Sequence, residues 1–202
     1  TTPNDVDECP RKTRRYPRFA RLRACNAPRH NLAMTETTQL LSDIREARER
    51  LLRVVEPMGG QPAAPGEWTA RDILEHLVLA EHAGIRRIWD AADSTRSATS
   101  DPSPNRGMSI EEIVARTWKP KETAPPNATP SGEGPLSYWI QVFRSSQETL
   151  AALGERLAGR DLETIVAPHF LCGPLDARQR LEFIRFHIDR HREQLEKLGP
   201  SA

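Results

Sequence analysis

Apolar residues recur at helical spacing in four long segments of the chain, and stretches rich in Pro, Gly, Ser and Thr separate these segments. This period predicts four amphipathic helices rather than strands. The helices are expected at about 36–56, 69–92, 135–158 and 176–198. The apolar run ETIVAPH, at 163–169, resembles a strand but has no evident partner strand. The expected fold is therefore all-α, an antiparallel four-helix bundle.

Local signals support the ends of these helices. Thr69, followed three residues later by Asp72, is an acidic variant of the capping box. Asp176 is a suitable N-terminal cap for the last helix, and Gly199 with Pro200 ends that helix. The predicted ends and the apolar period therefore agree.

The segment 93–134, between the second and third helices, is unusually long and rich in Pro, Ser and Thr. Within it the sequence SIEEIVARTW predicts a short helix, with Ser109 as cap and Glu112 completing a capping box. Long insertions in compact domains are often functional. We expect this Pro-rich insertion to pass over one end of the bundle.

The first 34 residues differ from the rest, because they are rich in Arg and show no helical or strand period. We expect residues 1–34 to form a disordered basic tail and residues 35–199 to form one bundle domain. A misplaced start is an open alternative, since Met34 opens the run MTETTQLL. A mitochondrial transit peptide is less favoured, because Asp5, Asp7 and Glu8 are acidic.

Composition narrows the functional class. The 202 residues are enough for one domain with a sizeable core. The 29 Lys and Arg balance the 28 Asp and Glu, which argues against a nucleic-acid or acidic-membrane partner. No run of about 18 apolar residues predicts a membrane span. Three scattered cysteines do not form a disulfide framework, so a cytoplasmic location is the default expectation.

The last predicted helix contains a histidine pair at helical spacing. His191 lies within its apolar stripe and His187 on the flank of that stripe, so both are expected to face the bundle interior. Residues i and i+4 lie one turn apart on the same face, so the two imidazoles can bind one metal ion. Imidazoles suit Zn, Ni, Cu or Fe better than Mg or Ca. Histidines that only form hydrogen bonds are the alternative.

Other residues with metal-binding or acid-base chemistry carry weaker signals. His76 lies at the edge of the apolar face of the second helix and is the candidate third ligand, whereas His82 should face solvent. Glu81 falls near the middle of that face, so its carboxylate needs a partner. It could orient a ligand histidine, pair with an Arg such as Arg180 or Arg185, or lie at a polar cavity. His169 and Cys172 form a His-x-x-Cys sequence in a loop, which is a minor metal-site candidate.

Two runs of sequence resemble a known family. GEWTARDILEHLVLAEHA looks like the second-helix signature of DinB-like (DinB/YfiT) proteins, and APHFLCGPLDARQRLEFIRFHIDRHREQL looks like their C-terminal signature. The resemblance covers about residues 36–198. It implies an up-down-down-up bundle with a metal site near one end, three histidine ligands at His76, His187 and His191, and water completing the coordination. It also implies a homodimer.

Studied members of this family include thiol-dependent S-transferases, a maleylpyruvate isomerase that uses a low-molecular-weight thiol, and proteins described as metal-dependent hydrolases. The resemblance therefore implies an enzyme that uses Zn or Ni to activate a thiol or water on a small-molecule substrate; in the thiol-dependent form, a low-molecular-weight thiol is the cofactor. The alternative is a non-catalytic, stress-associated metal-binding bundle, whose site would be closed by a protein ligand such as His169, Cys172 or Glu81. The long insertion and the basic tail depart from the family pattern.

Overall fold

The computed structural model describes residues 35–58, 67–94, 103–119 and 123–198, and this part of the chain is mostly helical. Its long helices are α1 (Glu36–Val55), α2 (Ala70–Asp93), α4 (Leu136–Leu157) and α5 (Ala177–Leu198). All four begin and end within one residue of the expected positions. The predicted basic tail, residues 1–34, lies outside the described residues.

The predicted N-terminal caps form at the expected helix ends, whereas the predicted stop at Gly199 and Pro200 lies outside the described residues. At the start of α2, the Thr69 side chain accepts from the Asp72 backbone N–H, and the Asp72 carboxylate accepts from the Thr69 N–H. At the start of α5, Asp176 and Gln179 exchange the equivalent pair of bonds, at 2.8 and 3.1 Å. These reciprocal bonds satisfy backbone donors that the first helical turn leaves free.

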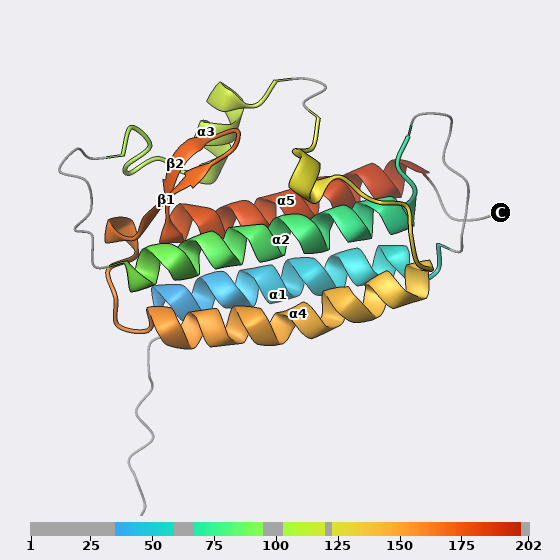
Figure 1. Ribbon diagram of the computed structural model, residues 1–202, viewed down its shortest axis with the longest axis horizontal. Helices are drawn as coiled ribbons and strands as arrows, with labels where there is room; N and C mark the ends of the chain where they lie inside the picture. The colour runs from blue at the N-terminus through green and yellow to red at the C-terminus, as the bar shows by residue number, and fades with distance from the viewer. Residues whose placement is uncertain (1–34, 59–66, 95–102, 120–122, 199–202) are drawn as a thin grey trace, which may run out of the picture. The chain divides into compact units, whose positions relative to one another are not determined.

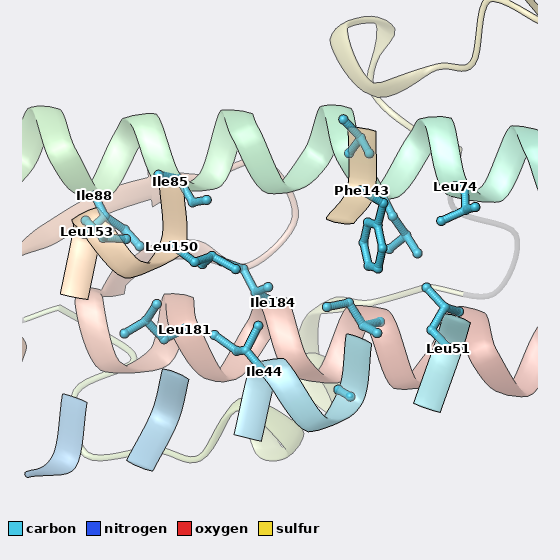
Figure 2. Packing of buried hydrophobic residues seen from close by; sticks show 14 of the residues in the cluster. Ile44, Leu51, Leu74, Ile85, Ile88, Phe143, Leu150, Leu153, Leu181 and Ile184 are labelled. Atoms are coloured by element: carbon cyan, nitrogen blue, oxygen red, sulfur yellow. The ribbon is translucent and has the colours of Figure 1, made fainter. Parts of the chain in front are cut away.

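One hydrophobic core joins the four long helices. Figure 2 shows buried side chains from all four meeting in this core, among them Ile44, Phe143, Leu150 and Ile184. Ile44, Phe143 and Leu150 are fully buried. Cutting a side chain of this kind back to Ala costs about 2–5 kcal/mol of unfolding free energy, so this core dominates the stability of the described region.

The four long helices run in an up-down-down-up order. Glu56, just after α1, pairs with Arg144 near the start of α4, so these two helices are antiparallel. Asp93 and Arg156 pair at the ends of α2 and α4, so those two run in the same direction. The colour gradients of Figure 1 show α1 and α5 running one way and α2 and α4 the other. The expected antiparallel packing thus holds for α1–α4 and α2–α5, whereas the contacting pairs α1–α5 and α2–α4 are parallel. The long connection between α2 and α4 permits this order.

The structure adds a small sheet to the expected all-α fold. Strand β1 (Val166–His169) pairs antiparallel with β2 (Gly173–Asp176), and His169 lies opposite Gly173. The prediction that ETIVAPH lacks a partner strand was therefore wrong. The partner sequence GPLD contains Gly and Pro, which weaken a strand signal. Gly173 has φ +71°, a left-handed conformation that lets the chain reverse tightly here.

The described parts of the insertion cover one face of α2 and α5. They form the predicted short helix α3 (Ile110–Thr117), with the Ser109–Glu112 capping box, and the short 3-10 helix η1 (Pro126–Ala128). A second 3-10 helix, η2 (Leu162–Thr164), precedes β1. In Figure 1, α3 and the sheet lie over one end of α2 and α5, while η1 lies farther along toward the other end.

None of the helices in the described part of the chain has the length and apolar character needed to cross a membrane.

Candidate metal centre

Three histidines from two helices converge beneath η1. His76 is in the second turn of α2, and His187 and His191 lie one turn apart on α5. The Nε2 atom of His187 is 3.1 Å from Nε2 of His76 and 3.0 Å from Nε2 of His191. The structure therefore brings together all three histidines that the DinB resemblance selected.

The outer nitrogens of two rings are held by acceptors. Nδ1 of His76 donates to the carbonyl oxygen of Ala128, at 2.7 Å, and Nδ1 of His191 donates to Oε1 of Gln194, at 3.0 Å. A ring that carries its proton on Nδ1 presents an Nε2 lone pair. The lone pairs of His76 and His191 therefore both point toward His187.

This arrangement fits a cation better than a hydrogen-bonded cluster. Nε2 of His187 can donate at most one hydrogen, so it can satisfy either His76 or His191 but not both. At least one close nitrogen pair is then repulsive unless a positive ion lies between the rings. Nitrogens bound to one zinc at 2.0–2.1 Å lie about 3.0–3.4 Å apart for the usual bond angles. The observed separations of 3.0 and 3.1 Å match that range closely.

Burial keeps the three rings neutral. Their exposed fractions are 6% for His76, 9% for His187 and 7% for His191. Desolvation lowers the pKa of His76, lowers that of His187 well below its ordinary value, and lowers that of His191 to about 3, with the neighbouring histidines adding to the last two shifts. Neutral imidazole is the form that binds metal, so no proton has to leave at neutral pH.

A buried carboxylate places the loop that holds His76. Glu75, 2% exposed, accepts from the backbone N–H and the hydroxyl of Ser131 and from the N–H of Gly132. Gly132 has φ +83°, which favours glycine at this turn. These bonds fix the chain just after η1, and so they help to position the Ala128 carbonyl over His76. Sequence reasoning missed Glu75, although it directly precedes a candidate ligand.

A large cavity opens beside the three histidines. Its volume is about 1090 Å³, and it is lined by α2, α5, the chain around η1 and the β1–β2 turn. Aromatic rings lie close to the histidines: the centroid of Trp68 is 4.8 Å from that of His76, and the centroid of Phe183 is 5.5 Å from that of His187. The site is therefore shielded on its sides and faces a space large enough for a small molecule.

Glu81 has a partner that the sequence analysis did not name. Its carboxylate is 2.5 Å from Nη1 of Arg48 on α1 and accepts from the Ser146 hydroxyl at 2.8 Å. The expected partners Arg180 and Arg185 were therefore wrong, and the buried ion pair is what forms. Arg48 was predictable in principle, because it occupies a core position between Ile44 and Leu51 in the apolar stripe of α1.

The remaining candidates lie outside the histidine cluster. Nδ1 of His169 accepts from the N–H groups of Leu171 and Cys172, at 3.2 and 3.1 Å, so that nitrogen is already used. Cys172 packs in a second apolar cluster with α3, and burial raises the pKa of its thiol. His82 is exposed, as predicted. In the described ranges, the group of His, Cys, Asp and Glu side chains placed to share one ion consists of His76, His187 and His191.

Comparison with known proteins supports the expected family. No curated protein and no solved structure matched the chain. The model of the DinB superfamily matches residues 43–195, a span that runs from α1 into α5 and contains all three clustered histidines. The chain therefore belongs to the DinB superfamily.

Proposed function

We propose that this protein binds one divalent transition metal through His76, His187 and His191 and uses the adjoining cavity to receive a small-molecule substrate. The convergence of one ring nitrogen from each of the three histidines, all within 4.8 Å of one another, carries the proposal. The ring tautomers and the neutral state of the rings support it. Zinc and nickel suit a site made of imidazoles. Such an ion, when bound, lowers the pKa of a thiol or water and makes it a better nucleophile at neutral pH.

An enzyme is favoured over a closed, structural site. Structural zinc sites have four protein ligands, whereas catalytic sites keep three and leave one position open. In the described part of the chain, none of the three candidates for a fourth ligand belongs to the group placed to share one ion. Glu81 binds Arg48, Nδ1 of His169 accepts from backbone N–H groups, and Cys172 packs in the second cluster. The side of the histidine cluster that faces the cavity is thus available to substrate.

The chain's own residues have distinct parts in this proposal. Ala128 and Gln194 fix the tautomers and ring directions of two histidines. Trp68 and Phe183 exclude water from the sides of the site. Glu81 lines the cavity, but both of its oxygens accept hydrogen bonds, so we assign it a structural role rather than that of a general base.

The fold enters the proposal as well. We infer that the four long helices make one DinB-type bundle domain over residues 35–199, and that the insertion between α2 and α4 serves as the roof of the cavity. The contacts of η1 with α2 and of α3 with α5 support this placement. A low-molecular-weight thiol as co-substrate and a homodimeric assembly remain parts of the proposal that derive from the family.

A turnover assay tests the enzymatic part. The protein, loaded with zinc or nickel, is mixed with a panel of thiols such as glutathione, cysteine and coenzyme A, with monochlorobimane as electrophile, and separately with activated esters. We expect turnover by the wild type and by the His82→Ala control, whose histidine is exposed, and loss of turnover in His76→Ala. Stoichiometric metal without turnover of any thiol or ester would favour the non-catalytic alternative.

A further inference from the structure

A buried arginine lines the cavity away from the histidines. Arg180, in the first turn of α5, is 5% exposed. One of its Nη atoms donates to the carbonyl oxygen of Pro168 on β1. Its Nε is buried without a hydrogen-bond partner. None of the carboxylates in the described ranges forms an ion pair with it. An unpaired buried charge is strongly unfavourable, so a positive group kept here points to a missing anion.

A second arginine lies across the cavity from the first. His76 on α2 faces His191 on α5, and the two helices are antiparallel, so a step of eleven residues along each brings Arg87 opposite Arg180. Both arginines line the cavity. Burial lowers the pKa of Arg180 to about 10, and the charge of Arg87 adds to this shift. Burial likewise lowers the pKa of His169 to about 3, with smaller contributions from the charges of Arg180 and Arg87. This end of the cavity therefore carries two positive charges beside a neutral imidazole.

The acidic residues that line the cavity do not balance this charge. Glu81 is already bound to Arg48, and Glu67 directly precedes Trp68, which packs on His76 at the other end. Of the described residues, none forms an ion pair with Arg87. Arg190 and Lys197 also line the cavity, on the part of α5 that carries His191. Arg180 differs from them because it is buried, and it lies with Arg87 at the end of the cavity away from the histidines.

We propose that the Arg180–Arg87 end of the cavity binds an anionic oxygen group, a carboxylate or a phosphate, of the small-molecule substrate. The guanidinium fork matches the oxygens of either group. Between that end and the histidines, the wall includes Leu77, Ala80 and Ile184, which suit an apolar linker. The ligand class is a small molecule with an apolar body and one anionic end.

The distance between Arg180 and the histidines sets the length of that molecule. Arg180 and His187 are seven residues apart on α5, which is about 10 Å along the helix axis. The anionic group would thereby direct the opposite end of the molecule toward the histidines. This directing role rests on the proposed function, whereas anion binding itself needs no metal.

The test measures anion preference in the full-length, metal-free protein by isothermal titration calorimetry. The probes are 4-phenylbutanoate, phenyl phosphate and the uncharged 4-phenylbutanamide. We expect the wild type to bind at least one anionic probe about tenfold or more tightly than the amide, since hydrogen bonds to charged groups are strong. Arg180→Gln and Arg87→Gln should each reduce that preference several-fold. Arg86→Gln, an exposed neighbour on α2 outside the cavity lining, should leave it unchanged.

The outcomes separate this inference from the proposed function. The inference is overturned if the wild type binds the acid, the phosphate and the amide equally, or binds none of them. It is also overturned if the preference for anions persists in both arginine variants. Arg87 is exposed, so its variant should fold even where Arg180→Gln does not. Metal binding is measured separately, on zinc-loaded samples of the same preparations. Bound metal without anion preference refutes the inference alone, and anion preference without metal binding refutes the proposed function alone.

Discussion

The buried ion pair between Arg48 and Glu81 makes a specific prediction about stability. Arg48 bonds to the Glu81 carboxylate at 2.5 Å, to the Ser146 hydroxyl at 2.9 Å and to the Phe143 carbonyl oxygen, and its guanidinium lies 3.9 Å from the centroid of the Phe143 ring. The side chains of Arg48 and Glu81 are 4% and 3% exposed. Arg48→Met keeps most of the side-chain volume and removes the charge. It leaves the Glu81 carboxylate buried with only Ser146 as a described partner.

The expected magnitude follows from that burial. Removing one member of a buried ion pair costs about 3–5 kcal/mol, because the remaining charge is not compensated. With a urea m-value of about 2 kcal/mol per molar, the unfolding midpoint should fall by about 1.5–2.5 M. Replacing both members by apolar residues should recover much of the loss. The double variant Arg48→Met/Glu81→Leu should therefore be more stable than Arg48→Met alone, with a coupling energy of about 2 kcal/mol.

Urea unfolding at neutral pH, followed by far-UV circular dichroism, measures these differences. Arg45→Met is the matched control, because Arg45 is an exposed arginine less than one turn away on α1. Its substitution should change the unfolding free energy by less than about 0.5 kcal/mol. The reasoning is refuted if Arg48→Met is no more destabilising than Arg45→Met. Strict additivity in the double variant would show that the pair is not coupled.

Three further predictions concern the site. Glu75→Gln should weaken metal binding about tenfold in a competition assay with a chromophoric chelator, because the loop that holds the Ala128 carbonyl over His76 loses its carboxylate anchor; unchanged affinity would argue against that positioning role. Gln194→Leu should have an effect of similar size, because Nδ1 of the third ligand loses its acceptor. The pKa of His169 is about 3 in the folded state, against an ordinary value of 6.5. Between these two pH values only the unfolded state binds a proton on this ring, so the unfolding free energy falls as the pH decreases from 6.5. Between pH 7 and pH 5, His169→Asn should therefore lose about 2 kcal/mol less unfolding free energy than the wild type, as measured by urea unfolding. Equal losses in the two proteins would contradict this prediction.

The sequence predicted the helices well because each carries its own period and caps. The stripe of α4 and the capping boxes at Thr69 and Ser109 are local signals, and they form as expected. The β1–β2 pair was missed because its second strand, GPLD, lacks a strand pattern and becomes extended through pairing with β1. The parallel packing of α1 with α5 follows from where long connections run, which helical periodicity does not encode.

The site was predictable to the extent that it depends on spacing within one helix. His187 and His191 were identified by their separation on one face, whereas His76 needed the family pattern, because its meeting with α5 depends on the register between two helices. The partner of Glu81 comes from a helix 33 residues earlier in the chain. The position of Arg87 opposite Arg180 likewise depends on the register between α2 and α5. Such contacts between distant segments leave little trace in a single sequence.

Metal content is the most direct test of the central claim that three histidines hold one divalent ion. Purified wild-type protein, His76→Ala, His187→Ala and the exposed control His82→Ala are loaded with zinc or nickel, passed through a desalting column, and analysed by inductively coupled plasma mass spectrometry. The account predicts one ion per chain in the wild type and in His82→Ala, and loss of the ion in both cluster variants, which should remain folded by circular dichroism. Full retention of metal in a folded His76→Ala protein would contradict the three-histidine site.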